Sequence, residues 1–230
     1  MFNEEQGAGA CIDSVITEIE KIPTVKYFIA VNDGSKDNTL NILQDKQKKY
    51  RKKLVIVNAK KNGGYGKALQ LGIQEAVKFN LEYILFMDSD LTNDPKSIAD
   101  FVKKIPGGYD CVKATRYSKG GKLQGIPIKR KIFSVAGSFV ARNLFRIGIA
   151  DCTNGFRMVK LSKLKNLHFK ENNFSIILEE LYYFKKMHAT FFEIPATLTT
   201  RKEGKTHFVY TPRLLYDYLK YSLKAFFIKT

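Results

Sequence analysis

Over the first 115 residues, short apolar runs of strand length alternate with segments of helical periodicity. Strands are expected at residues 25–31, 54–57, 83–87 and 109–115, and helices at about 8–20, 36–50, 67–79 and 95–104. Alternation of this kind predicts βαβ units, and therefore an α/β fold with a mainly parallel sheet flanked by helices.

Polar residues follow three of these strands where each one ends. Asp33 follows the first strand, Asp88 and Asp90 follow the third, and Arg116 follows the fourth. Ligands of open parallel sheets bind at the carboxyl ends of the strands, so these side chains are expected to converge. Two carboxylates one residue apart suit a hard divalent cation, which in turn can hold a diphosphate. Spacing alone leaves a second reading open, in which the two acids are a solvated loop and a helix cap.

The length of 230 residues fits one large domain, or a domain with an appendage. No apolar run reaches the roughly 18 to 20 residues that a spanning helix needs. The start of the chain, where Asn3-Glu4-Glu5 follows Met1-Phe2, does not predict a signal peptide. Three cysteines without metal-ligand spacing indicate buried or inert thiols in a reducing cytosol.

A formal net charge of +17 is compatible with nucleic acid, an anionic membrane or phosphorylated substrates as partners. The sequence has no RNA-binding aromatic signature, zinc finger or basic helix-turn-helix, so no nucleic-acid partner is expected. It also lacks a Walker loop, and the glycines at 63–66 do not follow a strand in the Gly-x-Gly-x-x-Gly manner. Phosphoryl transfer through a P-loop and NAD chemistry are therefore disfavoured.

The second half of the chain is less regular. A polar loop is expected at 120–127, helices at 131–146 and 175–187, a strand at 190–194 and a basic loop at 200–207. Residues 151–157 are expected to form a turn that precedes a short strand. The helix at 131–146 has one broad apolar face, formed by Ile132, Val135, Ala136, Phe139, Val140 and Phe145. Residues 210–228 are amphipathic and rich in aromatic and basic side chains. They predict either an ordinary packing helix or a helix in a membrane interface, and the chain is divided into a domain at 1–208 and this tail at 209–230.

Seven segments, in order along nearly the whole chain, resemble family 2 glycosyltransferases of the GT-A fold, most closely the dolichyl- or polyprenyl-phosphate mannosyl- and glucosyltransferases. They lie at 3–4, 31–39, 62–72, 87–95, 114–117, 153–160 and 193–208. Each one is weak by itself, but their common order is specific. One departure stands out: the family's first strand, an apolar run followed by Pro-x-x-Asn-Glu, is not found ahead of Asn3-Glu4. The expected sheet therefore lacks this strand, which would leave unpaired backbone groups in the centre of the sheet.

The resemblance implies roles for individual residues. Asp88 and Asp90 would bind Mg²⁺ or Mn²⁺, and the catalytic residues would be Asp90, Arg116 and Arg201. The residues implied in binding the nucleotide-sugar are Asn3, Glu4, Asp33, Ser35, Gly66, Lys67, Asp88 and Ser89. Those implied in holding an acceptor phosphate are Arg130, Ser134 and Arg201. Two departures, Asn32 in place of the family's first acid and Asn154 in place of its serine, affect the details of these assignments.

The function implied is an inverting, metal-dependent transfer of mannose or glucose from GDP-mannose or UDP-glucose to a polyprenyl phosphate. A divalent cation would stabilise the charge that develops on the departing diphosphate. A lipid phosphate is already ionised and needs little general-base help, which fits the scattered positions of His168, His188 and His207. The enzyme is expected as a peripheral protein on the cytoplasmic membrane face, with a membrane-embedded partner as in some family members. The alternatives are a glycan or other lipid acceptor, and a truncated, inactive sugar-nucleotide-binding remnant.

Overall fold

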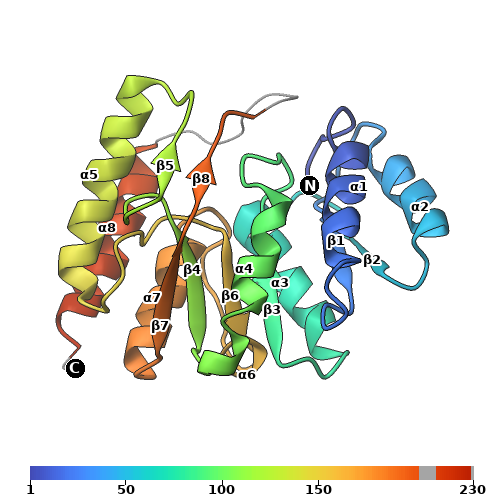
Figure 1. The fold of residues 1–230 in the computed structure, drawn as a ribbon. Helices are drawn as coiled ribbons and strands as arrows, with labels where there is room; N and C mark the ends of the chain where they lie inside the picture. Colours follow the sequence, from blue (N-terminus) through green and yellow to red (C-terminus); the bar gives the residue numbers. More distant parts are fainter. Residues whose placement is uncertain (202–210, 229–230) are drawn as a thin grey trace.

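The computed structural model describes residues 1–201 and 211–228, and its centre is a four-stranded sheet. The strands lie in the order β3 (Tyr83–Phe86), β6 (Arg157–Lys160), β4 (Cys111–Thr115) and β7 (Phe191–Pro195). A parallel pair, β1 (Phe28–Asn32) and β2 (Leu54–Asn58), lies beyond β3, and a short parallel pair, β5 (Lys122–Leu123) and β8 (Thr197–Leu198), lies above β4 and β7 (Figure 1).

Strand β6 runs antiparallel to both β3 and β4, whereas β4 and β7 are parallel. The direction of β6 follows from the path of the chain. Helix α5 (Ile128–Phe145) leads away from the end of β4, and residues 146–156 return to that end, where Ala114 N donates to Phe156 O at 3.0 Å. The expected α/β fold with a mainly parallel sheet is confirmed. The short strand predicted after the turn at 151–157 is present as β6, but its antiparallel direction was not predicted from the sequence.

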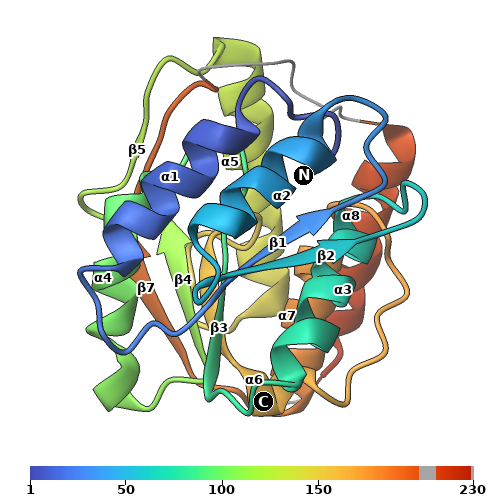
Figure 2. The same ribbon diagram turned by 90° about the vertical axis from the view of Figure 1, so that its right-hand side faces the viewer.

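Helices cover both faces of the strands (Figure 2). On one face lie α1 (Ala8–Ile19), α2 (Thr39–Lys49) and α4 (Ile98–Val102). Helix α4 follows a 3-10 turn at Pro95–Ser97 and precedes a second one at Ile105–Gly107. On the other face lie α3 (Tyr65–Val77), α6 (Leu161–Leu164) and α7 (Ile176–Lys186). Helix α1 buries one stripe at helical spacing, consisting of Ala8, Cys11, Ile12, Val15, Ile16 and Ile19.

Helices α5 and α8 (Pro212–Phe226) pack side by side at the edge of the molecule (Figure 1). The apolar face predicted for 131–146 is present, but much of it faces solvent. Ile132 is 60% exposed and Phe139 is 63% exposed, whereas Phe145 is fully buried. Among the described residues, no helix has the length and apolar character that crossing a bilayer requires.

The three cysteines are free and buried, and burial raises the pKa of each thiol to about 12. This agrees with the expectation of inert thiols.

A gap separates β1 from β3. Within the described part of the chain, β1 is hydrogen-bonded to β2 alone among the strands, and β3 to β6 alone. The gap falls in the centre of the combined sheet, which is where the resemblance places the strand that the sequence lacks.

Candidate active site

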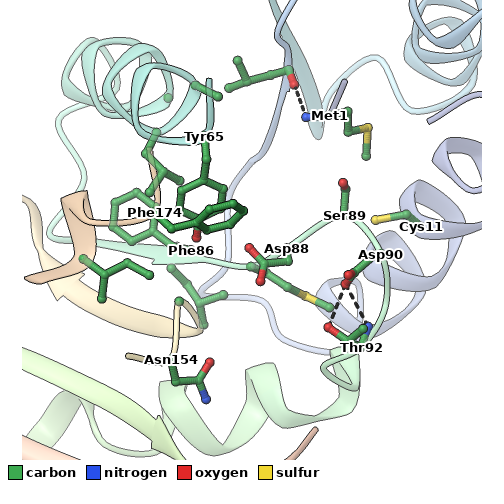
Figure 3. A pocket seen from close by; sticks show the side chains of 18 of the residues that line it. Met1, Cys11, Tyr65, Phe86, Asp88, Ser89, Asp90, Thr92, Asn154 and Phe174 are labelled. Atoms are coloured by element: carbon green, nitrogen blue, oxygen red, sulfur yellow. Dashed lines mark hydrogen bonds between the residues drawn. The ribbon is translucent and has the colours of Figure 1, made fainter. Parts of the chain in front are cut away.

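The acidic turn begins directly after β3. Asp90 folds back on its own loop, and its Oδ1 accepts hydrogen bonds from Thr92 N at 3.1 Å and Thr92 Oγ1 at 2.7 Å (Figure 3). The helix cap is a different residue, since Asp94 accepts from Lys96 N at the start of the 3-10 turn. Asp88 and Asp90 therefore do not cap this turn, so the alternative in which one of them serves as a helix cap does not hold.

Asp88 lies in an environment that disfavours its negative charge. Burial, with a further contribution from the charge of Asp90, raises the pKa of Asp88 to about 6. A hydrogen bond from the Tyr65 hydroxyl acts in the opposite direction and stabilises the carboxylate. Tyr65 is itself held in place, because its ring stacks on Phe174 at 4.4 Å between centroids. Gly155 leaves room for the hydroxyl, since a Cβ at that position would lie 2.6 Å from it.

Asp33, at the end of β1, holds the glycine turn that precedes α3. Its two carboxylate oxygens accept from Gly63 N and Gly64 N, each at 2.9 Å. Gly64 has a φ of +91°, a conformation that favours glycine. The sequence therefore shapes one wall of the site through a buried carboxylate and two glycines.

The site also carries two arginines, each paired with an acid. Arg116 binds Asp151 through two hydrogen bonds of 2.6 and 2.8 Å. Burial disfavours the charge of Asp151, but the Arg116 guanidinium outweighs burial and holds the pKa of Asp151 below its usual value. Arg201 forms an ion pair with Glu4, whose backbone N–H donates to Thr39 Oγ1 at 2.8 Å.

Most of the predicted residues line one cavity of about 1280 Å³. They are Glu4, Asp33, Asp88, Ser89, Asp90, Arg116, Ser134 and Arg201. The central prediction, that the acidic pair shares a cleft with Asp33 and Arg116, is thus consistent with the structure.

Four predicted residues do not line this cavity, namely Asn3, Ser35, Gly66 and Lys67. Asn3 and Ser35 bond to each other through Asn3 N and Ser35 Oγ at 3.0 Å, and so join the chain start to the turn before α2. Gly66 serves close packing, because a Cβ there would lie 2.4 Å from the carbonyl oxygen of Glu171. The side chain of Arg130 and the whole of His207 lie outside the described residues.

Sequence reasoning assigned no role to two aromatic residues of the site, Tyr65 and Phe174. Tyr65 falls inside the matching segment at 62–72, so its position was available as a signal. Phe174 comes from a loop without a motif, and only the folded chain brings it to Tyr65.

Asp88 and Asp90 are a suitable donor set for a divalent cation. Two carboxylate groups close together, one of them with a raised pKa, form an arrangement whose mutual repulsion a dication relieves. Among the described residues, no group of three or more His, Cys, Asp and Glu side chains converges on one point. A cation held here would therefore complete its coordination with phosphate oxygens of a ligand, or with water.

Comparison with known proteins identifies the family. The sequence model of glycosyl transferase family 2 matches residues 1–168 of this chain. The chain belongs to glycosyl transferase family 2. The resemblance inferred from the seven segments is thereby confirmed at the level of the family.

Relatives of this family 2 member are found in archaea and cyanobacteria. An uncharacterized protein of Methanocaldococcus jannaschii is 30% identical over 176 residues, covering 73% of this chain and 72% of that protein. The dolichol-phosphate mannosyltransferase of Pyrococcus furiosus is 28% identical over 196 residues, covering 84% and 53%. An uncharacterized glycosyltransferase of Synechocystis is 32% identical over 159 residues, covering 69% and 48%. The chain thus spans about half the length of the last two relatives.

Among solved structures, glucosyl-3-phosphoglycerate synthase from Mycobacterium tuberculosis superposes with a TM-score of 0.66 at 16% identity, covering 100% of this chain and 79% of that one. A second structure of that synthase, in complex with Mn²⁺ and UDP-glucose, has a TM-score of 0.61 at 18% identity, covering 90% and 69%. At this level of identity the likeness concerns the fold, and it confirms the expected GT-A class for the family 2 chain.

Proposed function

We propose that this chain catalyses the metal-dependent transfer of mannose or glucose from a nucleotide-sugar to a polyprenyl phosphate, with inversion at the anomeric carbon. The observation that carries the proposal is the single cavity, which holds the acidic pair at one end and reaches an apolar surface of α5 and α8 at the other. A polar donor and a lipid acceptor would enter such a cavity from opposite ends.

The donor end has the groups that a nucleoside diphosphate-sugar needs. Asp88 and Asp90 would hold Mg²⁺ or Mn²⁺, and Tyr65 would orient Asp88 toward it. When bound, the cation supplies positive charge to the diphosphate as it departs. Asp33 keeps the glycine turn in place beside the nucleoside, and Arg116 lines the cavity with its guanidinium fixed by Asp151. The Mn²⁺ and UDP-glucose in the mycobacterial synthase support this assignment of the donor end.

The acceptor end is lined by residues of α5 and α8, namely Phe133, Ser134, Gly137, Leu215 and Tyr218. A polyprenyl chain is apolar and its phosphate is ionised, so the reaction needs orientation and charge compensation more than proton removal. Ser134 lies at this end, with its Oγ 2.7 Å from the Tyr117 hydroxyl. Arg130 and Arg201 are proposed to compensate the acceptor phosphate. The similarity to the Pyrococcus dolichol-phosphate mannosyltransferase supports this class of acceptor.

We further propose that α5 and α8 lie together on the cytoplasmic face of a membrane. The two helices pack against each other, and both expose large apolar residues, namely Ile128, Ile132, Phe133, Val135, Phe139, Val140, Leu215, Tyr216, Leu219, Leu223, Phe226 and Phe227. Exposed apolar surface of this extent is characteristic of a protein or membrane contact. The net charge of +17 favours an anionic lipid surface over a second copy of the chain, because two copies repel each other. A membrane-embedded partner protein would be recruited on the same side.

The transfer assay combines GDP-mannose or UDP-glucose with and without polyprenyl phosphate, in the presence of Mn²⁺ or Mg²⁺, and measures label in the lipid phase. We expect Asp90→Ala to abolish transfer while the fold is retained. Asp94→Ala is the matched control, because Asp94 belongs to the same acidic loop but does not line the cavity. Absence of transfer to lipid with both donors, but transfer to a glycan, would favour the alternative acceptor. Unchanged turnover in Asp90→Ala would contradict the proposed role of Asp90 in binding a catalytic metal ion.

Vesicle flotation tests the membrane surface separately. The chain is expected to float with vesicles that contain anionic lipid and to float less after Phe139→Ser combined with Phe227→Ser. Tyr27→Ser is the control, since Tyr27 is an exposed aromatic residue directly before β1, a strand that lies away from α5 and α8 (Figure 1). Equal flotation of both variants would refute a surface formed by α5 and α8.

A further inference from the structure

The loop between α6 and α7 carries a buried acid, Glu171, that is bonded to helix α8. Its Oε1 accepts hydrogen bonds from Lys220 Nζ at 2.7 Å and from the Tyr221 hydroxyl at 2.8 Å, and both donors belong to α8. Its Oε2 accepts from Ser175 Oγ at 3.3 Å. Three donors around one buried carboxylate hold this side chain in a single position.

Glu171 and Lys220 form an ion pair. Burial disfavours the charge of Glu171, but the hydrogen bonds from Lys220 and Tyr221 outweigh burial and hold the pKa of Glu171 below its usual value. The bond to Glu171 in turn raises the pKa of Lys220. Lys220 Nζ also lies 3.5 Å from Asp217 Oδ1 of its own helix. The pair therefore ties the loop to α8 by a charge-assisted bond at neutral pH.

The backbone of the same loop lies against the first turn of α3. Asn172 O accepts from Gly66 N at 2.8 Å, and Glu171 O accepts from Gln70 Nε2 at 3.3 Å. The two backbones are in close contact, since a Cβ on Gly64 would lie 2.5 Å from Asn172 O and a Cβ on Gly66 would lie 2.4 Å from Glu171 O. A displacement of the loop must consequently displace the start of α3.

The loop and the start of α3 together hold the tyrosine that contacts the acidic turn. Phe174 of the loop stacks on Tyr65, the first residue of α3, with the ring centroids 4.4 Å apart and the ring planes inclined by 24° (Figure 3). The Tyr65 hydroxyl is hydrogen-bonded to Asp88. A continuous series of contacts therefore leads from Lys220 of α8 through Glu171 to Asp88.

We propose that Glu171 is a positioning residue for the metal site, which acts through Tyr65. Its ion pair with Lys220 keeps the loop at 171–174 in the place where Phe174 and the start of α3 direct the Tyr65 hydroxyl to Asp88. The affinity for the cation then depends on the position of α8. This inference rests on the proposed function, in which Asp88 and Asp90 hold a divalent cation. It also gives α8, one of the two helices proposed to face the membrane, an influence on the donor end of the cavity.

Lys220→Met is the decisive variant, because it breaks the ion pair and removes a positive charge. The loss of a positive charge would by itself favour a bound cation, so weaker Mn²⁺ binding reports a change of position. We expect the Kd of Mn²⁺, measured by the electron paramagnetic resonance of free Mn²⁺, to rise about tenfold. Lys224→Met is the matched control, since Lys224 is an exposed lysine one turn further along α8 and should leave the Kd unchanged. Equal Kd values for the two variants would overturn the proposal.

Two additional comparisons test the contact and its route. Lys220→Arg keeps the ion pair and should restore most of the affinity that Lys220→Met loses. In a Tyr65→Phe background, Lys220→Met should cause little further rise in Kd, because the hydroxyl through which it acts is already absent. A rise as large as in the unmodified protein would show that the effect bypasses Tyr65, contrary to the proposal.

Hydrogen exchange in EDTA separates this inference from the proposed function. The Gly66 amide, which donates to Asn172 O, should exchange about tenfold faster in Lys220→Met, with the Ala76 amide at the far end of α3 as the internal reference. Failure of the unmodified protein to bind Mn²⁺ would count against the proposed function, and Gly66 exchange would then decide the inference, since an unchanged rate would overturn it. Normal Mn²⁺ binding that Lys220→Met leaves unaffected would overturn the inference alone.

Discussion

Replacing Asp88 with asparagine is expected to stabilise the metal-free protein at neutral pH. Burial, with the charge of Asp90 adding to it, raises the pKa of Asp88 from 3.8 to about 6. At about 1.4 kcal/mol per pKa unit, ionisation of this carboxyl group disfavours the native state by up to about 3 kcal/mol. Asp88 faces the cavity, so solvent screening lowers this figure, and a gain of about 1 to 3 kcal/mol is expected for Asp88→Asn.

The sign of the pH dependence follows from the direction of the shift. A raised pKa means that the native state binds the Asp88 proton more tightly than the unfolded state does. The stabilising effect of this proton is complete below about pH 4 and is lost as the pH rises through about 6. Urea unfolding in EDTA between pH 4 and pH 8 should therefore give similar free energies of unfolding for the two proteins at pH 4. Asp88→Asn should be more stable above pH 6.

Asp110→Asn is a matched control of opposite sign. Burial disfavours the charge of Asp110, but the Thr190 N–H and the Lys163 ammonium outweigh burial and hold the pKa of Asp110 below its usual value. This variant should lose stability at neutral pH, and the deficit should shrink in acid. Mn²⁺ should stabilise the unmodified protein but not Asp88→Asn. An Asp88→Asn protein that follows the unmodified protein at every pH would refute the electrostatic reasoning about the acidic turn.

Three other changes test the surroundings of the site. Arg157→Met leaves the buried carboxylate of Glu180 without its ion pair. This variant should lower the free energy of unfolding by about 3 to 5 kcal/mol in a urea titration. Replacing both residues by apolar ones should recover most of that loss. Gly66→Ala should lower the free energy of unfolding by about 1 to 3 kcal/mol in the same titration, because its Cβ would lie 2.4 Å from a carbonyl oxygen. Gly137→Ala has open space around its Cβ and should leave the free energy of unfolding unchanged or raise it slightly. Tyr65→Phe should weaken Mn²⁺ binding by about tenfold or more, measured by the electron paramagnetic resonance of free Mn²⁺, because the carboxylate of Asp88 loses a hydrogen bond that orients it.

The elements with strong periodicity were predictable from the sequence. The strands and helices before residue 115 lie within a few residues of the predicted ones, because each combines an apolar pattern with a turn signal at its end. The helix predicted at 67–79 begins at Tyr65 instead, since the glycine turn held by Asp33 sets its start. The direction of β6 was not predictable, because it depends on the return path of residues 146–156 and not on local pattern.

For the site, the position of each residue at the end of an expected strand was enough to predict that four of them line one cavity, namely Asp33, Asp88, Asp90 and Arg116. Motif matching could not separate residues that line the cavity from residues that pack behind it, and Gly66 belongs to the second kind. The pairing of Arg116 with Asp151 was equally inaccessible, because it joins positions 35 residues apart through the turn after α5.

The ion pairs that Arg116 and Arg201 each form with an acid also affect the order in which ligands bind. Among the described residues, the lining of the cavity includes four carboxylates, those of Glu4, Asp33, Asp88 and Asp90, together with the guanidinium groups of Arg116 and Arg201 and the Met1 ammonium. Each arginine is already matched to an acid, Arg116 to Asp151 and Arg201 to Glu4. A diphosphate that enters the donor end alone meets an excess of negative charge. Divalent ion and nucleotide should consequently bind with positive cooperativity, each raising the affinity for the other by the same factor.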